Sequence, residues 1–550
     1  MPRRTEPRTG ATVGAALLAV QINGSKNRRP RSQPSHPGFT GYTRQGNSLA
    51  YAPHTCGIFS FHPDVIVTTE DSRTASAPHL VVLGGGLAGL TAAEAALNRV
   101  PGVRITIVEP TGRPGGVLET VRDGGWLVER SADSFLGARP EGVALVERLG
   151  LTSELIGIEP RVRRALVWHA GRTVPAPDGF RLLAPGLLTG ILSTPLLSPA
   201  GRLRVLVERF VPPRRPPAED ATADESLESF AVRRLGREAF ERLVQPLASG
   251  IWTADPARLS MAAACPEFLE MERSDGSLWA GEHRRLRAKA HAVAAGARYG
   301  QFLSLARGME SLPARLAEHL RDRGATFVQA RASGIVPGPT GGWEIPLAAG
   351  ATGLARLAAD AVVVAVPAPA AAGLFAGLDG ALAADLAAIE YAGSAIVSLG
   401  FARDDVAHPL DAAGLVVPRV AGRRALAVSF SSSKFLGRAP AGCVLMRVFL
   451  GGALDPEALD RDDDALVALA YEEAAILVGA RGRPRLVQVA RWAGAMPQYH
   501  VGHLVRMQRI ELALAAHPGL ALAGNAYTGV GIPQVIASGQ TAAARCFGVA

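Results

Sequence analysis

The stretch that decides the fold is HLVVLGGGLAGLTAAEAALNRVPGVRITIVE, which runs from His79 to Glu109. Its first five residues form an apolar run that ends at glycine, which predicts a buried strand of a parallel sheet. Apolar residues then recur at helical spacing from Leu87 to Leu97. The segment 103–109, VRITIVE, predicts a second strand, so the whole stretch is a strand–helix–strand unit of about 30 residues.

Three glycines stand where the first predicted strand meets the helix, as Gly84, Gly86 and Gly89 of a GxGxxG motif. The first permits the tight turn, the second lets backbone amides approach a pyrophosphate, and the third lets the helix pack closely on the strand. Glu109 follows 20 residues after Gly89, at the end of the second strand, where a carboxylate can accept hydrogen bonds from ribose hydroxyls. The unit is therefore predicted to bind the ADP half of a dinucleotide.

Two further glycine-rich segments extend this predicted site. Residues 113–116, RPGG, follow the acidic residue closely, and their glycines would let a second stretch of chain pass near the diphosphate. Near the other end of the chain, residues 521–533 read ALAGNAYTGVGIP and predict a short buried strand, a glycine-rich loop and a helix from about Gln534. The unpaired amides and partial positive charge at the start of that helix suit a negatively charged ligand.

The remaining pattern alternates between helices and strands, and no repeat is visible. Helical spacing occurs at 142–150, 225–247, 311–323 and 534–547, and strand patterns occur at 166–169, 172–175, 326–336, 343–347, 361–366, 485–492 and 520–523. A dinucleotide unit thus opens the fold, and a strand, glycine loop and helix close it. We therefore expect the end of the chain to return to the cofactor domain.

Composition indicates a globular protein with a large core, since 48% of its 550 residues are hydrophobic and 19% are charged. The net charge is +9, but residues 1–64 hold eight basic and two acidic residues and account for +6 of it. The nearly neutral remainder has no dense basic stripe, which excludes a general nucleic-acid-binding protein.

The leader, residues 1–77, is predicted to lie outside the fold. It is rich in Arg, Pro, Ser and Gly, and it imitates in part a signal peptide and in part a transit peptide. After Met1 the next methionine is Met261, and we interpret the leader as disordered or artefactual. The four cysteines are scattered without a CxxC pair, which favours reduced thiols in the cytoplasm, and no apolar run reaches the roughly 20 residues of a membrane span.

Beyond these patterns, several segments resemble a known enzyme family. The spacing E-x3-R-x-G-G that begins at Glu109 resembles FAD enzymes of the glutathione-reductase type, which implies FAD rather than NAD. The chain is similar to protoporphyrinogen and coproporphyrinogen oxidases, which are amine-oxidase-like FAD enzymes of haem synthesis, at GWLVERSADSFLGARPE (125–141), 224–261, AMPQYHVGHL (495–504) and GNAYTGVGIP (524–533). It departs from them at Ser131-Ala132, where the family usually has Gly-Pro, and at Ala306-Arg307, where a doubled glycine is common.

The resemblance implies an α/β fold. An interleaved FAD-binding domain (Rossmann-like, glutathione-reductase type) is expected together with a mixed-sheet substrate domain and a helical lobe. The expected FAD-binding segments are 78–140, 301–375 and 505–550. The expected substrate segments are 141–300, which includes a membrane-facing helical lobe, and 376–504.

The predicted site residues follow from the glycine motifs and the resemblance. The residues expected to contact FAD are Gly84, Gly85, Gly86, Leu87, Ala88, Gly89, Glu109, Pro110, Arg113, Gly116, Val117, Ser131, Ala132, Asp133, Ser134, Ser333, Asn525, Val530, Gly531 and Ile532. Arg139 is the predicted partner of a substrate carboxylate, because a guanidinium can hold a carboxylate through two hydrogen bonds. No catalytic triad and no metal are expected, because the flavin would carry the chemistry. His500 and His503 are interpreted as structural, since no third metal ligand accompanies them.

The implied reaction is the oxygen-dependent aromatisation of a porphyrinogen. Protoporphyrinogen IX is the first choice and coproporphyrinogen III the second, with six electrons removed in three flavin cycles and hydrogen peroxide formed. The expected partners of this cytoplasmic enzyme are the porphyrinogen, molecular oxygen, the inner membrane surface, neighbouring haem-pathway enzymes and a second copy of the chain. Two alternatives stay open. One is an amine oxidase or carotenoid desaturase, although Trp252 and Tyr499 are too few to argue an amine-binding aromatic cage. The other is a non-catalytic flavin-binding scaffold.

Overall fold

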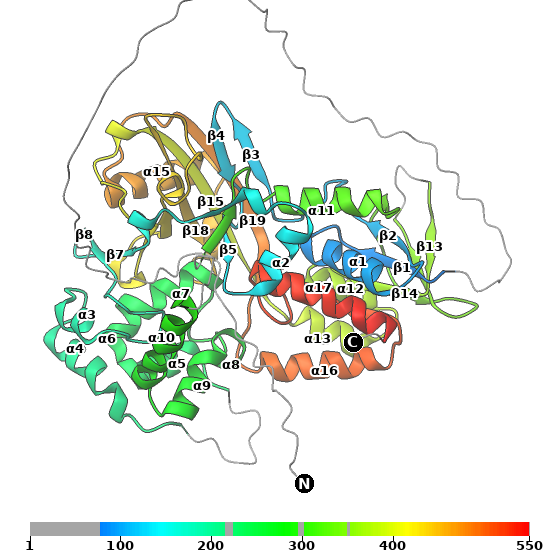
Figure 1. The fold of residues 1–550 in the computed structure, drawn as a ribbon, viewed down its shortest axis with the longest axis horizontal. Coiled ribbons are helices and arrows are strands. Elements are labelled where there is room, and N and C mark those ends of the chain that lie inside the picture. The colour runs from blue at the N-terminus through cyan, green and yellow to red at the C-terminus, as the bar shows by residue number, and fades with distance from the viewer. Residues whose placement is uncertain (1–76, 215–223, 295–301, 349–352, 549–550) are drawn as a thin grey trace, which may run out of the picture. The chain divides into compact units, whose positions relative to one another are not determined.

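A parallel sheet forms around the opening glycine motif. The computed structural model describes residues 77–214, 224–294, 302–348 and 353–548, and the predicted leader lies outside them apart from Ala77. As predicted, strand β1 (His79–Leu83), helix α1 (Leu87–Arg99) and strand β2 (Arg104–Val108) form a βαβ unit with parallel strands. The five-stranded parallel sheet has the order β10-β2-β1-β14-β20 and is completed by β10 (Thr326–Val328), β14 (Ala361–Val364) and β20 (Leu520–Leu522) (Figure 1).

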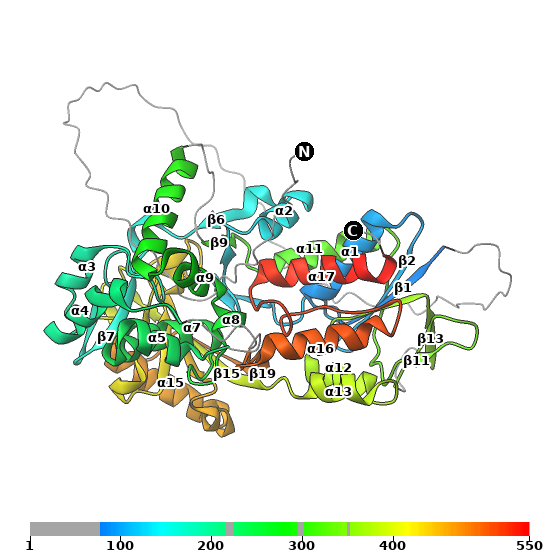
Figure 2. The same ribbon diagram turned by 90° about the horizontal axis from the view of Figure 1, so that it is seen from below.

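Helices cover both faces of this parallel sheet, because alternate side chains of its apolar strands point to opposite faces. One face packs Leu80 and Val82 against α1, α2 (Pro140–Arg148), α11 (Ser311–Asp322) and α17 (Ile532–Phe547). The other face packs Val81 and Leu83 against α12 (Ala368–Phe375), α13 (Gly380–Ala387) and α16 (His503–Ala515). Figure 2 shows the two layers on either side of the strands.

A second, mixed sheet has the order β19-β15-β18-β17-β16-β7-β8. Its strands are β7 (Ala165–His169), β8 (Arg172–Pro175), β15 (Tyr391–Ala402), β16 (Gly414–Val416), β17 (Ala425–Ser429), β18 (Cys443–Gly451) and β19 (Leu486–Pro497). Helix α15 (Asp463–Val478) packs on one face and the helical lobe on the other. The predicted hairpin at 166–175 is confirmed as the β7–β8 pair, although it belongs to a sheet drawn mostly from residues 391–497.

Small sheets link these parts. They are the hairpin of β3 (Thr120–Asp123) and β4 (Trp126–Glu129), the sheet of β5 (Phe135–Leu136), β9 (Phe302–Leu305) and β6 (Leu155–Gly157), and the sheet of β11 (Val336–Pro337), β12 (Trp343–Pro346) and β13 (Arg356–Ala359). The prediction of one strand over 326–336 is wrong. The chain leaves the parallel sheet after β10 because the backbone N–H of Ser333 donates to the carbonyl of Pro346, 2.9 Å away, in the neighbouring small sheet.

The helical lobe contains α3 to α10. Its helices are α3 (Leu188–Ser193), α4 (Pro199–Leu206), α5 (Leu227–Leu235), α6 (Arg237–Ala239), α7 (Gln245–Trp252), α8 (Met261–Ala264), α9 (Pro266–Asp275) and α10 (Leu278–Ala294). The segment 225–247 is helical from Leu227, as predicted, but it is divided into several helices. Gly236 adopts a φ of +89°, which ends α5, and a π-helical turn at Phe240–Val244 leads into α7.

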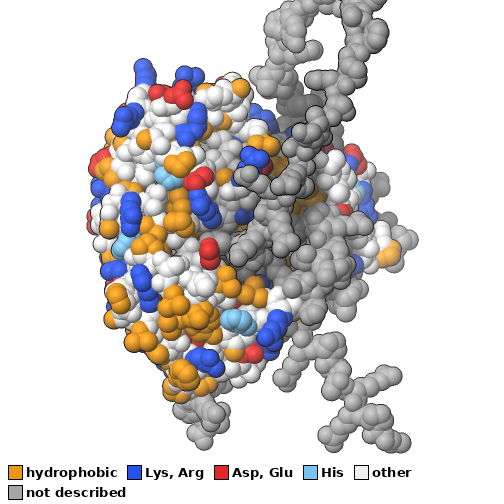
Figure 3. All heavy atoms as spheres, turned by 60° about the vertical axis from the view of Figure 1, so that its left-hand side comes forward, with side chains coloured by type: hydrophobic (Ala, Val, Ile, Leu, Met, Phe, Trp, Pro, Cys, Tyr) orange, Lys and Arg blue, Asp and Glu red, His pale blue; other side chains and the backbone are white. Residues whose placement is uncertain are grey.

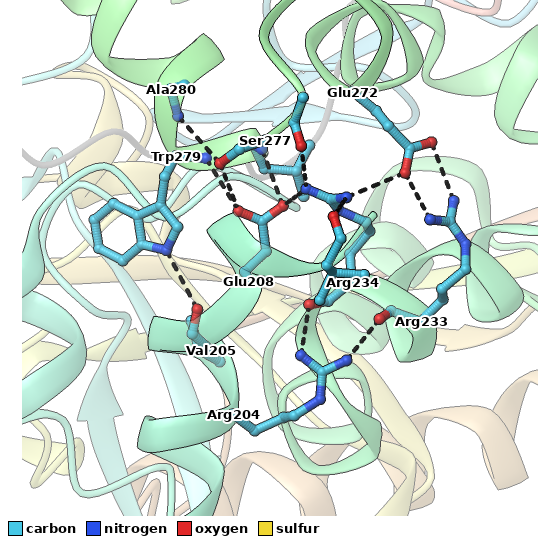
Figure 4. Close-up of polar contacts among 12 residues, drawn as sticks. Arg204, Val205, Glu208, Arg233, Arg234, Glu272, Ser277, Trp279 and Ala280 are labelled. Atoms are coloured by element: carbon cyan, nitrogen blue, oxygen red, sulfur yellow. Dashed lines mark hydrogen bonds and ion pairs between the residues drawn. The ribbon is translucent and has the colours of Figure 1, made fainter. Parts of the chain in front are cut away.

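A network of buried ions, here called the lobe cluster, holds these helices together (Figure 4). Arg234 is fully buried and pairs with Glu208 and, at 3.3 Å, with Glu272. Glu208 also accepts hydrogen bonds at the start of α10, from the Ser277 hydroxyl at 2.9 Å and the Leu278 amide at 3.0 Å. The remaining members are Arg204, Glu225 and Arg233.

Within the described ranges, no helix is both long and apolar enough to cross a bilayer. The same ranges contain no group of three or more His, Cys, Asp or Glu side chains arranged to hold a metal ion.

Candidate functional site

The turn between β1 and α1 contains two kinds of glycine. Gly84 and Gly89 have no space for a side chain, whereas Gly86 does. A Cβ on Gly84 would lie 2.5 Å from the carbonyl oxygen of Ala365, and a Cβ on Gly89 would lie 2.0 Å from that of Gly84. A Cβ on Gly86 would meet nothing closer than the Cα of Gly116, at 3.9 Å. The protein therefore leaves open room above Gly86, as a ligand that approaches the backbone there requires.

The start of α1 is open to an anion. The helix begins at Leu87 after Gly86, and no side chain caps it, so the amides of Leu87, Ala88 and Gly89 carry the partial positive charge of the helix terminus. The second glycine segment lies beside this turn, as predicted, because the Gly115 amide donates to the Gly85 carbonyl at 2.8 Å. These segments together form a backbone-lined cradle of the kind that fits a diphosphate.

Glu109 lies against the same turn. One carboxylate oxygen accepts a hydrogen bond from the Gly85 amide at 2.9 Å, and the other accepts from the Thr111 hydroxyl at 2.7 Å. Pro110 follows it directly, where β2 has ended. The predicted ribose acceptor is therefore held at the carboxyl end of β2, next to the cradle.

The side chain of Arg113 binds backbone carbonyls of its own glycine-rich loop. Its guanidinium donates to the carbonyl of Leu118 at 3.1 Å and to that of Gly116, and it pairs with Glu310 at 3.6 Å. Val117, between these carbonyls, exposes 45% of its surface. Arg113 thus has a structural role in the loop, and an apolar side chain is presented beside it.

The segment before α17 leads into a helix that packs against α1. The chain turns at Gly524 and Gly529, with φ of +142° and +137°, and α17 begins at Ile532, two residues earlier than predicted, with Gly531 before it and no side-chain cap. A Cβ on Gly539 would lie 2.3 Å from the carbonyl of Ala88, so α17 crosses α1 in close contact. The two uncapped helices are thereby packed together, and Val530 packs at the edge of the lobe core.

A tyrosine–histidine stack supports that C-terminal loop, residues 524–531. Tyr499 and His503 have ring centroids 4.1 Å apart with planes inclined by 13°. The Tyr499 hydroxyl bonds to Asn525 and Gly529, and the Nε2 of His503 donates to the carbonyl of Tyr527 at 3.2 Å. Burial lowers the pKa of His503 to about 4, so the ring is neutral at pH 7. The structural interpretation of His503 stays a prediction, and its burial and its bond to the loop agree with it.

The segment Ser131–Ser134 rests on buried charges. Asp133 is 2% exposed and pairs with Arg447 and, at 2.8 Å, with Lys434. Burial alone would raise the pKa of Asp133, but the charges of Arg447 and Lys434 outweigh it and hold the pKa well below its usual range. Arg447 also donates to the carbonyl of Ser131 at 2.6 Å. The Asp133 side chain is thus fully engaged with protein, and it fixes the backbone of this segment.

The buried charges beneath this segment form a second network, here called the site cluster. It comprises Asp133, Lys434, Arg447, Glu129 and Arg438. Burial lowers the pKa of Lys434, an effect that Asp133 opposes, and burial raises the pKa of Glu129, an effect that Arg438 opposes. The cluster joins residues of the β4 region to the mixed sheet and neighbouring loops.

Two predicted residues lie apart from the cradle. Ser333 is in the loop after β10, and its hydroxyl donates to the carbonyl of Pro346 at 3.1 Å. Arg139 precedes α2 at its N-cap position and is half-buried. Within the described residues, Arg139 forms no ion pair within 4 Å, but its charge acts on the buried carboxylate of Glu267 in α9, whose pKa burial raises.

Sequence reasoning missed Tyr499, Lys434, Arg438 and Arg447 as parts of the site. Tyr499 lies in the segment 495–504 that resembles the oxidase family. That resemblance was the one signal in the sequence that could have identified Tyr499 as part of the site. The three cations lie in segments without a recognisable motif, and only the fold brings them beneath Ser131 and Asp133.

Known proteins match this chain over almost all of its described length. The sequence profile of flavin containing amine oxidoreductases matches residues 87–547. Coproporphyrinogen III oxidase of Bacillus subtilis (strain 168) is 31% identical over 475 residues, which cover 84% of this chain and 97% of that protein. The chloroplastic protoporphyrinogen oxidase 1 of Spinacia oleracea is 29% identical, with 84% and 83% covered. A crystal structure from Exiguobacterium sp. 255-15, provisionally named a protoporphyrinogen oxidase, has a TM-score of 0.73 at 29% identity and covers 85% of this chain and 98% of that one.

Proposed function

Because the chain belongs to the family of flavin-containing amine oxidoreductases, we propose that it is an FAD-dependent porphyrinogen oxidase of haem synthesis. The substrate is protoporphyrinogen IX or coproporphyrinogen III, and oxygen is the electron acceptor. The observation that carries the proposal is the extent of the match to the Bacillus protein, 97% of whose length is covered. The similarity therefore includes the parts that bind substrate as well as those that bind flavin.

FAD fits the cradle on three counts. The open room above Gly86 admits a ligand, the uncapped start of α1 favours a diphosphate, and the Glu109 carboxylate can exchange its bond to Gly85 for bonds to ribose hydroxyls. When bound, FAD accepts a hydride from the substrate and passes the electrons to oxygen. The chain itself would bind and orient both reactants, and Ser131–Ser134 and the start of α17 are the segments that would hold the flavin ring.

We assign the two large sheets to different tasks. The parallel sheet, with its strands from 79–108, 326–364 and 520–522, forms the FAD-binding domain. The mixed sheet and the helical lobe form the substrate domain, and Arg139 directly precedes α2. This division is supported by the site residues of the cradle, which lie at the carboxyl ends of parallel strands, where α/β folds bind nucleotides.

Arg139 is the proposed partner of a substrate carboxylate. Its guanidinium is half-buried and forms no ion pair within 4 Å inside the described residues, and its charge acts on the carboxylate of Glu267 in α9. The Arg139→Ala variant should raise KM for the porphyrinogen about tenfold while the flavin spectrum stays unchanged, because one charge-assisted contact is worth about 1.5–3 kcal/mol. Unchanged KM and kcat would contradict this role.

The alternative of an amine oxidase is less well supported. An amine substrate is held by exposed aromatic faces beside the flavin. Trp252 and Tyr499, the candidates for such a cage, are 2% and 1% exposed, and Tyr499 is occupied by its stack on His503. Neither ring is free to line a pocket.

We propose that the protein attaches to a lipid surface through its helical lobe. The lobe exposes several large apolar side chains. Phe210 is 76% exposed, and the others are Leu187, Leu188, Leu192, Leu203 and Val207. Hydrophobic side chains also gather on the lower part of the face that Figure 3 shows. Co-sedimentation with anionic phospholipid vesicles should fall with Phe210→Glu and not with Leu512→Glu, which alters an equally exposed leucine of α16. Equal binding of both variants would contradict attachment through the lobe.

A single experiment tests the function. The FAD-loaded protein is offered each porphyrinogen under air, and porphyrin fluorescence and hydrogen peroxide are followed together. We expect fluorescence to rise with at least one substrate, with three peroxide molecules formed per porphyrin because six electrons leave. The Gly86→Val variant, which fills the open room above the turn, should fold but bind no flavin. Flavin-loaded protein that oxidises neither porphyrinogen would overturn the proposal.

A further inference from the structure

We propose that Tyr499 is a positioning residue, which fixes the C-terminal loop at residues 524–531 and thereby sets the start of α17 against the flavin. The inference rests on the proposed function, because the assignment of this loop to FAD is made there. It adds a residue that does not itself contact the cofactor and whose effect passes through the loop.

The hydroxyl of Tyr499 spans the loop. It donates to the carbonyl of Asn525 at 2.5 Å and accepts from the amide of Gly529 at 2.8 Å. Gly529 adopts a φ of +137°, a conformation that side chains rarely adopt, and its amide has no place in a helix or strand. One buried hydroxyl therefore satisfies a donor and an acceptor at opposite ends of the same loop.

The ring of Tyr499 is held in place by His503. The two rings stack at 4.1 Å, and the His503 Nε2 bonds to Tyr527, which is a third point of the same loop. Because a carbonyl oxygen only accepts, Nε2 must carry the proton, and this fixes the tautomer of the neutral ring. The loop is thus held at residues 525, 527 and 529 by two adjacent side chains.

The backbone of Tyr499 is attached to the lobe. Its carbonyl accepts from the amide of Ser260 at 2.8 Å, and the neighbouring amide of Val501 donates to the carbonyl of Arg258 at 2.8 Å. Ser260 in turn caps α8, accepting from the Ala263 amide at 2.9 Å. Tyr499 therefore connects the lobe to the C-terminal loop through its backbone and its hydroxyl.

The loop leads directly into α17. Gly529 is three residues before Ile532, where the uncapped helix begins. A helix start stabilises negative charge near it, and flavin gains negative charge on reduction. Holding the loop should therefore raise the flavin reduction potential, because the helix start then favours the reduced form.

Tyr499→Phe tests the proposal, because it removes the hydroxyl and leaves the ring to stack. The matched control is Tyr471→Phe on α15, whose hydroxyl also donates to a carbonyl, that of Gly482 at 2.9 Å, in a different core. FAD affinity, flavin reduction potential and thermal stability are measured for both variants and for the original protein. For Tyr499→Phe we expect about a tenfold weaker FAD affinity and a potential about 30 mV lower, which is a tenfold loss in preference for the reduced form.

The control should lose less thermal stability, because its hydrogen bond is exposed to solvent, and should keep both flavin properties. A Tyr499→Phe protein whose potential equals that of the original would overturn the inference, whatever its stability. None of these measurements needs a porphyrinogen. A protein that oxidises no porphyrinogen yet shows the shifted potential would therefore remove the proposed substrate and leave the role of Tyr499 in place.

Discussion

The two buried ion clusters differ in what they join. The lobe cluster links residues 204–278, which are near one another in the chain, and in it Glu208 and Glu272 pair with Arg233 and Arg234 (Figure 4). The site cluster links Glu129 and Asp133 to Lys434, Arg438 and Arg447, with up to 318 residues between partners. Its three cations exceed its two carboxylates.

We therefore expect the lobe cluster to stabilise the fold alone and the site cluster to stabilise the proposed flavin site as well. The lobe cluster fastens helices α5, α9 and α10 to one another, so its loss should weaken the lobe alone. The site cluster holds the backbone at Ser131 through Arg447 and leaves one positive charge in excess beneath the proposed flavin site. Its loss should therefore change cofactor binding as well as stability.

The largest effect is expected from Asp133→Asn. The change keeps the shape of the side chain and leaves Lys434 and Arg447 without their buried counter-charge, so stability should fall by about 3–5 kcal/mol. The protein should also be purified without flavin, which its absorption spectrum would reveal. The control is Asp385→Asn, which breaks an exposed pair with Arg509 and should cost less than about 1 kcal/mol. Full flavin content in Asp133→Asn would contradict the proposed role of the site cluster.

Glu208→Gln should affect stability and not flavin. It leaves Arg234 buried beside an amide, so a loss of about 3–5 kcal/mol is again expected. The start of α10 loses a charged acceptor for the Leu278 amide as well. Chemical denaturation would measure the loss, and the flavin spectrum of the folded variant should match the original. A variant that folds but loses its flavin would remove the distinction between the clusters.

The contrast also explains what the sequence could predict. The β1–α1–β2 unit follows from a glycine motif and an acidic residue at short spacing, because each contact there is local. The helical spacing over 225–247 did not reveal the break at Gly236, because only the positive φ of that residue ends α5. Lys434 and Arg447 were missed because nothing in their local pattern shows that they meet Asp133 some 300 residues away. Tyr499 lay in a recognised segment, but its partners become visible only in the fold.

The stability of the protein should depend on pH through His503, which holds the C-terminal loop. The pKa of His503 is lowered to about 4, below the ordinary value of 6.5, so the unfolded chain takes up this proton at a higher pH than the native protein. Stability should therefore fall as the pH drops from about 6.5 to about 4, by roughly 2–3 kcal/mol. Below that range the depressed pKa of Asp133 takes over, because its contribution is present above the unfolded pKa of about 4 and is lost as the pH falls further.

His503→Gln isolates the histidine component. The amide can still donate to the carbonyl of Tyr527, and it does not titrate. Between pH 6.5 and about 4.5 the stability of this variant should fall less steeply than that of the original protein, and the remaining slope should come from other histidines whose pKa burial lowers, such as His79 and His408. Glu208→Gln should keep the original slope. Denaturation curves over this range would check both, and an unchanged slope in His503→Gln would contradict the assignment.

The smallest effect is expected at the edge of the lobe cluster, from Arg204→Met. Arg204 is half-buried and donates to the carbonyls of Arg234 at 3.0 Å and Arg233 at 2.6 Å, which are in the last turn of α5. A cation at a helix C-terminus satisfies unpaired carbonyls and interacts favourably with the helix dipole. Methionine preserves most of the side-chain packing, and water can reach the freed carbonyls, so the cost should be about 1–2 kcal/mol rather than that of a buried pair. Arg273→Met on α9 is the control, because its exposed side chain forms no ion pair within the described residues and should be neutral. A loss as large as that of Glu208→Gln would mean that the cluster acts as one unit, with its edge as important as its buried centre.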